Sequence, residues 1–230
     1  MNKLDTTTTL DSDNFQAVVE NRRSIRGFLD RQIAQSDLEK IFTLAQRAPS
    51  NCNTQPWSVA VVSGDRCRTL ATKITKAMMI GDIQMDFPYE GVYEGVYKNR
   101  QHQAAADLYG AMGIGREDKT ERGEAFMRNF DFFDAPHVAF FFLPKNFGVR
   151  EAADLGMYTQ TFMLALTAHG MGSCPQTALS FQPHIIRKEL GISDDQKLLF
   201  GMSFGYPDLD CAANNCTTGR EDCHDVVSFF

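Results

Sequence analysis

The sequence predicts an α+β fold, and three observations support this class. Runs of β-forming residues occur at 57–62, 137–143 and 197–204, so the predicted strands lie far apart along the chain. Segments with helical periodicity separate them in uneven numbers. The order is therefore not the regular strand–helix alternation of a doubly wound parallel sheet. We expect one domain over residues 13–230, preceded by a disordered lead at 1–12.

The first third of the chain predicts three helices and one strand. Asp13 suits the N-cap of a helix with apolar residues at 15, 18 and 19. Ser36 to Glu39 reads as a capping box, which starts a second helix that ends before Pro49. The strand at 57–62 closes at Ser63-Gly64, and a third helix follows from about 65 to 79.

The middle of the chain predicts a helical excursion at about 80–130. Glycines and a proline interrupt residues 80–100, yet Tyr89, Tyr93 and Tyr97 recur at steps of four, which would align them on one helix face. Helices are predicted at 101–112 and 120–130. We expect part of this segment to form an aromatic lid over a substrate. The alternative is that the aromatic residues only pack the excursion.

The last hundred residues give the clearest patterns. Residues 137–143 are apolar without alternation, so this strand should be buried on both faces. The longest helix is predicted at 151–169, with Gly170 as its C-cap signal, and a short helix at 183–190 should end at Gly191. Residues 197–204 form the next strand, and 225–230 an edge strand or arm.

Composition and charge exclude some classes of function. The chain has 230 residues, of which 43% are hydrophobic, enough to bury a substantial core. Its formal net charge of −6 argues against nonspecific nucleic-acid binding, which needs a basic surface. The N-terminal residues carry no apolar segment, and no run approaches the length of a membrane span. We expect a cytoplasmic protein with no membrane or nucleic-acid partner.

Cysteine and histidine do not form a recognisable metal site. Cys211, Cys216, Cys223 and His224 cluster near the C-terminus but lack the Cys-x-x-Cys pair of structural zinc sites. We therefore expect unlinked thiols and no metal. The five histidines are scattered, and we expect them at the surface or at helix caps.

Two segments carry the candidate chemistry. Arg22, Arg23 and Arg26 follow the first helix, with Ser24 between them. Positive charge at a helix C-terminus can simply complement the helix dipole. A fork of arginine donors with a hydroxyl also suits a terminal phosphate. The second segment, residues 48–57, is either an ordinary helix-to-strand loop or a loop that presents amides to a heteroaromatic ring.

Together these segments resemble the opening of the FMN-dependent nitroreductases. The matching motifs are Arg22-Arg23-Ser24-x-Arg26 and Pro49-Ser50-x-x-Asn53-x-Gln55-Pro56-Trp57. Residues 128–136, 170–176 and 201–206 resemble later family segments in the same order, and Thr218-x-Arg220 falls at the family's late basic element. The resemblance covers most of residues 14–230. It implies a mixed, mainly antiparallel sheet flanked by helices, in a homodimer that exchanges C-terminal arms.

The resemblance also implies the cofactor contacts. Arg22, Ser24 and Arg220 would hold the FMN phosphate, with Arg23 in the same cluster, and Arg26 would lie near the flavin edge where reduction builds negative charge. Many relatives carry Lys or Arg at Thr218, so the clamp here has one charge fewer. The partner subunit would contribute Pro49, Ser50, Asn51 and Asn53, and Gln55 is a further cofactor contact. The loop Pro175, Gln176, Thr177 and Ala178 would face the other side of the flavin, with a backbone N–H near Thr177 aimed at N5. Asn129 would lie at the flavin edge, with Arg128 as its alternative.

The activity that the resemblance implies is two-electron, ping-pong reduction of nitroaromatic compounds or quinones by NADH or NADPH, with the FMN at the subunit interface. Phe87, Tyr89, Tyr93 and Phe126 are the candidate substrate contacts. One alternative keeps the FMN but changes the reaction, for example to reductive dehalogenation. The others are a noncatalytic FMN carrier or sensor, and an anion-binding domain without a cofactor.

Overall fold

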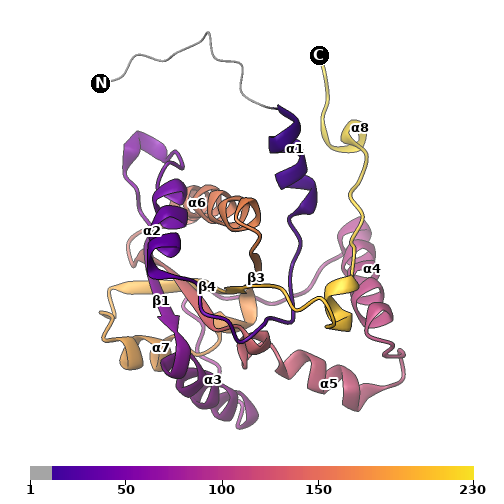
Figure 1. The fold of residues 1–230 in the computed structure, drawn as a ribbon, viewed down its shortest axis with the longest axis horizontal. Coiled ribbons are helices and arrows are strands. Elements are labelled where there is room, and N and C mark those ends of the chain that lie inside the picture. Colours follow the sequence, from indigo (N-terminus) through magenta and orange to yellow (C-terminus); the bar gives the residue numbers. More distant parts are fainter. Residues whose placement is uncertain (1–11) are drawn as a thin grey trace.

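A computed structural model describes residues 12–230 of the chain. Its centre is a four-stranded antiparallel sheet in the order β1-β2-β4-β3. The strands are β1 (Ser58–Ser63), β2 (His137–Pro144), β3 (Gly172–Gln176) and β4 (Gln196–Gly205). Helices lie above and below this sheet (Figure 1). The predicted α+β class is confirmed.

Strand β2 is buried on both faces, as its uninterrupted apolar sequence predicts. Val138, Phe140 and Phe142 face the cluster formed with α3 (Gly64–Met79) and α7 (Pro183–Leu190). Its alternate residues Ala139, Phe141 and Leu143 face the cluster formed with α2 (Gln35–Ala45) and α6 (Val149–Ala168). Because each buried aromatic or aliphatic side chain contributes roughly 1.5–3 kcal/mol, this strand anchors both halves of the core.

Four helices lie at the periphery of the described residues. They are α1 (Ser12–Asn21), α4 (Gly95–Ala111), α5 (Lys119–Met127) and α8 (Cys223–Val226), and none contains a buried residue. Helices α4 and α5 lie together to one side of the sheet in Figure 1 and account for the predicted helical excursion. No helix in the part of the chain that the structure describes is long and apolar enough to cross a membrane.

Several helix boundaries match the predictions, but the predicted capping box is wrong. Helix α7 begins at Pro183 and ends with Gly191 at φ +69°, the left-handed conformation expected of a C-cap glycine. Helix α2 begins one residue before Ser36, and its N-cap is Ala34, which has no side chain that could cap it. Ser36 therefore lies inside the first turn.

The predicted alignment of the three tyrosines on one helix face is also wrong. Helix α4 begins only at Gly95, so Tyr89 and Tyr93 precede it and Tyr97 alone lies within it. Gly91 and Gly95 both have positive φ, and these two turns interrupt the helical spacing. The hydroxyl groups of Tyr89 and Tyr93 nevertheless lie 3.4 Å apart.

The segment at 172–176 is a strand that the sequence pattern does not reveal. Pro175 and Gln176 end β3, and Thr177 and Ala178 begin the 3₁₀ helix η3 (Thr177–Ser180), so the expected 175–178 loop is instead regular structure. The expected C-terminal strand is absent from the described residues, in which α8 is followed by four residues without regular structure. Of the expected disordered lead, residues 1–11 lie outside the described chain, and Ser12 begins α1.

Two further expectations concern cysteine and histidine. All six cysteines are free thiols, and residues 12–230 contain no group of three or more His, Cys, Asp or Glu side chains that could hold a metal ion. The expectation that all five histidines lie at the surface or at caps is wrong, because His137 is 1% exposed. Its Nε2 accepts the N–H of Ile33 (2.9 Å), so in the neutral ring Nδ1 carries the proton toward Ser63 Oγ (2.7 Å).

Burial lowers the pKa of His137 to about 4, and this makes stability depend on pH. In the unfolded chain the ring takes up its proton near pH 6.5. The contribution of the neutral ring is therefore fully present above that pH and is lost as pH falls from 6.5 to 4. Between pH 7 and pH 4 we expect the wild type to lose about 3 kcal/mol more unfolding free energy than His137→Gln.

Denaturant titrations of both proteins at several pH values measure this difference. The other titrating groups are common to the two proteins, so their contributions cancel. Parallel curves of unfolding free energy against pH would show that His137 does not titrate differently in the folded chain.

Candidate anion-binding and cofactor site

Residues 22–26, here called the arginine segment, follow α1 and run along the outer edge of β3. Ser24 forms an isolated parallel bridge with Ser173, and the N–H of Ile25 donates to the Ser173 carbonyl (3.0 Å). A Cβ at Gly172 would lie 2.5 Å from Ile25 Cγ1, so only glycine allows this approach. The edge of the sheet thereby fixes the backbone from which the arginine side chains project.

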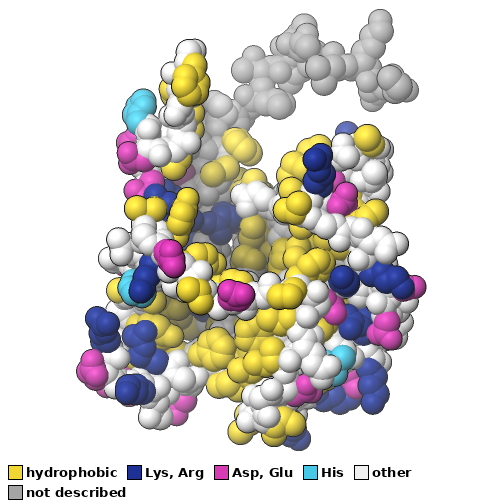
Figure 2. Space-filling view, turned by 180° about the vertical axis from the view of Figure 1, so that it is seen from behind, with side chains coloured by type: hydrophobic (Ala, Val, Ile, Leu, Met, Phe, Trp, Pro, Cys, Tyr) yellow, Lys and Arg dark blue, Asp and Glu magenta, His cyan; other side chains and the backbone are white. Residues whose placement is uncertain are grey.

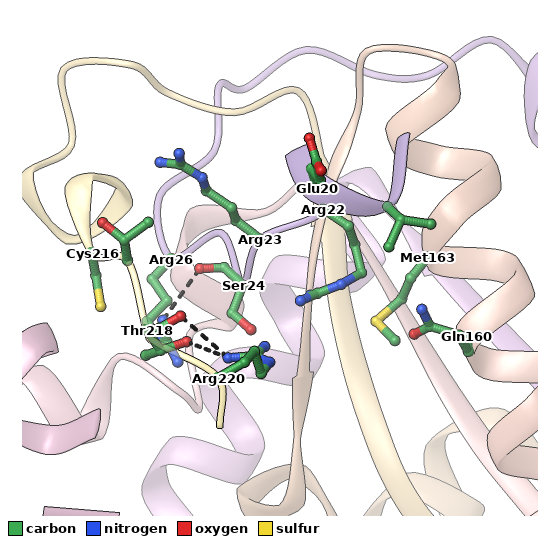
Figure 3. A pocket seen from close by; sticks show the side chains of 12 residues that line it. Glu20, Arg22, Arg23, Ser24, Arg26, Gln160, Met163, Cys216, Thr218 and Arg220 are labelled. Atoms are coloured by element: carbon green, nitrogen blue, oxygen red, sulfur yellow. Dashed lines mark hydrogen bonds between the residues drawn. The ribbon is translucent and has the colours of Figure 1, made fainter. Parts of the chain in front are cut away.

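Beside this segment lies an open pocket of ≈ 790 Å³. In Figure 3 the guanidinium of Arg22 points into the space between Arg220 and the α6 side chains Gln160 and Met163. The guanidinium of Arg23 and the carboxylate of Glu20 point away from this space. The lining residues come from the end of α1, the arginine segment, α6 and the C-terminal segment: Val19, Glu20, Arg22, Arg23, Ser24, Arg26, Gln160, Met163, Cys216, Thr217, Thr218 and Arg220.

The pocket has an excess of positive charge, since four arginines and one carboxylate, that of Glu20, line it. Within residues 12–230, none of its four arginines forms an ion pair with a carboxylate. Burial, and then the nearby charge of Arg220, lower the pKa of the Arg22 guanidinium. An anion between Arg22 and Arg220 would remove this repulsion, so the electrostatics favour a negatively charged ligand.

Thr218 orients Arg220 within the C-terminal segment. The Arg220 guanidinium donates to Thr218 Oγ1 (3.0 Å), to the Thr218 carbonyl (3.3 Å) and to the Gly219 carbonyl (2.8 Å). These bonds hold the side chain beside the pocket (Figure 3). The threonine thus supplies no charge, but its hydroxyl fixes the direction of a neighbouring one.

Asn129 and Gln176, both predicted cofactor residues, are joined to each other. Gln176 Nε2 donates to the carbonyl (3.0 Å) and to the Oδ1 (3.3 Å) of Asn129, while its Oε1 accepts from the N–H and hydroxyl of Ser203. The Gln176 side chain is 4% exposed and fully used by these bonds. It holds Asn129 in place. Arg128, the alternative to Asn129, pairs with Asp134 (2.6 Å).

The loop at 49–55 does not line the arginine pocket of its own chain. It is exposed, apart from the half-buried Ser50, and it includes the 3₁₀ helix η1 (Asn51–Asn53). The N–H of Asn51 donates to Asp154 on α6 (3.1 Å), and the N–H of Gln55 donates to Ser50 Oγ (2.9 Å). Asn53 and Gln55 both adopt positive φ. The loop therefore has a fixed shape, and Pro49, Ser50, Asn51, Asn53 and Gln55 lie outside that pocket.

None of the four predicted substrate residues lines the arginine pocket. Phe87 packs against the core, with Lys197 Nζ over its ring at 5.7 Å from the centroid. Phe126 packs edge-on against Phe130, and neither Tyr89 nor Tyr93 lines the arginine pocket. Their role in a lid stays a prediction. Gln160, Met163 and Thr217 line the pocket although no sequence motif singles them out, and Cys216, which the sequence indicated only as part of a cysteine cluster, lines it too.

The fold and the pocket define an α+β protein with an arginine-lined pocket at the edge of its sheet. A family model described as the nitroreductase family matches residues 19–206, and the chain belongs to this family. Nitroreductase NfnB of Mycolicibacterium smegmatis is 41% identical over 216 residues, which cover 93% of this chain and 92% of that protein. The 4-nitrobenzoate reductase of Pseudomonas putida is 33% identical over 221 residues, covering 95% and 96%.

A solved structure shows the same similarity in three dimensions. It is the FMN-dependent nitroreductase NfnB from Mycobacterium smegmatis in complex with NADPH. The two structures superpose with a TM-score of 0.91 at 39% identity, over 95% of this chain and 99% of that one. The similarity of the two folds thus extends over nearly the whole chain.

Proposed function

We propose that this chain is an FMN-dependent oxidoreductase that uses NADPH to reduce nitroaromatic compounds. The observation that carries the proposal is the pocket at the edge of β3, where arginines converge without a carboxylate to pair with them. The similarity to an FMN-dependent, NADPH-bound relative over nearly the whole chain supports the same cofactor and reductant. When bound, FMN supplies two-electron transfer from the reductant to the acceptor.

The donors of the pocket fit a phosphate monoester. Arg22 and Arg220 provide two guanidinium groups whose mutual repulsion an anion would relieve, and Ser24 adds a hydroxyl between the arginines. Charge-assisted hydrogen bonds of this kind are the strong ones in protein–phosphate recognition. We assign the FMN phosphate to Arg22, Ser24 and Arg220.

Arg26 has a different role in this proposal. Its guanidinium donates to the Ser24 carbonyl (3.2 Å) and lines the pocket below Ser24 (Figure 3). A fixed positive charge beside an electron acceptor stabilises the negative charge that reduction creates, at no cost of reorganisation. We assign Arg26 to this tuning of the reduction and not to phosphate binding.

Exposed apolar side chains support a homodimer. Phe15 and Val19 on α1, Met157 on α6, and the C-terminal Phe229 and Phe230 are large hydrophobic residues exposed to 40% or more. Hydrophobic side chains also gather around a hollow at the centre of the face shown in Figure 2. Apolar surface of this kind is typical of an interface. We propose that the exposed 49–55 loop of one subunit completes the cofactor site of the other.

Removal of residues 224–230 tests the C-terminal arm. If Val226, Val227, Phe229 and Phe230 cross onto the second subunit, the truncated protein should dissociate at concentrations where the full chain is dimeric. It should also lose bound FMN, because the two subunits build the site together. Sedimentation together with the ratio of FMN to protein measures both effects. A truncated monomer with its full FMN content would contradict the exchange of arms.

Substrate class is tested by turnover with NADPH. We expect 4-nitrobenzoate to be consumed with formation of the hydroxylamine, and we expect initial-rate patterns of a ping-pong reaction. A quinone and a halogenated phenol are the comparison substrates. If the halogenated phenol released halide and the nitro group of 4-nitrobenzoate were not reduced, the activity of the same FMN site would be reductive dehalogenation.

A further inference from the structure

The backbone of Arg26 is held by one side chain from the C-terminal segment. The N–H of Arg26 donates to Asn214 Oδ1 at 2.6 Å. The amide nitrogen of the same asparagine donates to the carbonyl of Gly27 (2.8 Å) and to that of Asp208 (2.8 Å). Asn214 thereby bonds to both sides of the Arg26–Gly27 peptide, from the 3₁₀ helix η4 (Ala212–Asn215).

The carbonyl of Arg26 faces two further groups. The thiol of Cys211 donates to it at 3.6 Å, and the guanidinium of Arg128 lies at 3.5 Å. Arg128 is itself held by Asp134, which has φ +63° within a turn of three positive-φ residues. Both polar atoms of the Arg26 backbone are thus engaged by segments more than a hundred residues away in sequence.

Gly27 is required by this packing. A Cβ at residue 27 would lie 2.4 Å from Cys211 Sγ and 2.5 Å from Cys211 Cβ. Its φ is not in the left-handed region, so the restriction is one of space and not of backbone conformation. The arginine segment and η4 therefore fit together only while residue 27 has no side chain.

The segment that holds Arg26 also carries part of the pocket wall. Cys216, Thr218 and Arg220 follow Asn214 within six residues. Helix α4 packs against η4, and Arg100 on that helix pairs with Glu221 (2.8 Å). The position of Arg26 is consequently set by the same segment that places Arg220, with α4 as its outer support.

We propose that Asn214 is a positioning residue for Arg26. It fixes the peptide from which the Arg26 side chain projects and so keeps the guanidinium at the place where it tunes the reduction. This inference rests on the proposed function, in which Arg26 acts on bound FMN. Small displacements of a charged group from its working geometry have large effects on rate, which is why a residue that touches no ligand can matter here.

Asn214→Ala tests the proposal, with Asn215→Ala as the matched control. Asn215 lies in the same 3₁₀ helix, is exposed and makes no side-chain hydrogen bond to the residues that the structure describes. Three quantities are measured: amide hydrogen exchange of the peptide containing residues 25–27 without NADPH, the dissociation constant for FMN, and the rate at which NADPH reduces bound FMN.

We expect Asn214→Ala to raise the exchange rate of the Arg26 N–H by about tenfold, because this N–H loses its hydrogen bond to Asn214 Oδ1. The reduction should slow by roughly tenfold or more, while the FMN dissociation constant changes by less than about threefold, because Arg22 and Arg220 are not touched. Asn215→Ala should leave all three quantities unchanged. Wild-type exchange and reduction in Asn214→Ala would overturn the proposal.

A second pair of variants covers the case in which Asn214→Ala fails to fold. Gly27→Ala should displace η4 and slow the reduction, and Cys211→Gly in the same chain should restore it by making room for the new methyl group. A normal rate in Gly27→Ala would contradict the inference. A wild-type protein that binds no FMN would instead contradict the proposed function, and the exchange measurement would still decide whether Asn214 holds the Arg26 peptide.

Discussion

Replacement of Arg22 by Gln is expected to raise the dissociation constant for FMN by about a hundredfold. The side chain points into the pocket, where burial and then the nearby charge of Arg220 lower the pKa of its guanidinium. Loss of one charge-assisted hydrogen-bonding group costs about 1.5–3 kcal/mol, and 1.4 kcal/mol corresponds to a factor of ten in affinity. Equilibrium titration of the apoprotein, followed by quenching of FMN fluorescence, measures the change.

Arg23→Gln is the comparison variant, because it removes the same formal charge one residue further along. Its guanidinium points away from the pocket and its side chain is exposed, so we expect the FMN dissociation constant to rise by less than about fivefold. Equal losses of FMN affinity in Arg22→Gln and Arg23→Gln would mean that the pocket attracts the phosphate through net charge alone. The assignment of the phosphate to the fork of Arg22, Ser24 and Arg220 would then be wrong.

Arg26→Gln is expected to act on the reduction more than on binding. A preorganised charge of this kind is worth roughly 10²–10³ in rate when it is removed, so NADPH should reduce the bound FMN about a hundredfold more slowly. The FMN dissociation constant should change by less than about threefold, since the phosphate ligands remain. Stopped-flow reduction under anaerobic conditions gives the rate. If NADPH reduced the bound FMN at the normal rate but the variant bound FMN weakly, Arg26 would be a ligand of the phosphate.

A comparison of Arg26→Gln with Asn214→Ala separates the effect of the Arg26 charge from the effect of its position. Asn214→Ala keeps the guanidinium and loosens its backbone, so its reduction rate should lie between those of the wild type and Arg26→Gln. High salt should not restore the rate in either variant, because neither substitution acts through the exposed charges that salt screens.

Local patterns predict the parts of this fold that local forces determine. Strand β2 and helix α7 are recognisable because an unbroken apolar run, or a proline start with a glycine end, has one physical outcome. Serine is a common N-cap residue, but Ser36 does not occupy the N-cap position of α2. The packing of Leu38 and Ile41 against α6 decides where this helix begins. The tyrosine spacing failed because two positive-φ glycines outweigh the helical period.

The site, like the fold, contains parts that local sequence patterns predict and parts that depend on distant contacts. The arginine segment could be found from residue types that suit a phosphate, whereas Arg220 was predicted only from the resemblance to the family. The structure brings both to one pocket. Strand β3 has a Gly-Ser-Cys-Pro-Gln sequence with low β propensity, and it forms because β4 supplies its hydrogen bonds. Asn214 carries no local signal at all. Its importance arises only from contacts with Arg26 and Gly27, which lie 188 and 187 residues away.

The visible absorption spectrum of the purified protein, recorded anaerobically before and after addition of NADPH, tests most directly whether the chain is an FMN-dependent oxidoreductase. We expect a yellow protein whose flavin absorption bleaches with NADPH and returns when a nitroaromatic acceptor is added. A yellow protein that NADPH does not bleach would be an FMN carrier or sensor. A colourless protein that FMN does not reconstitute would contradict the cofactor assignment itself and leave an anion-binding domain.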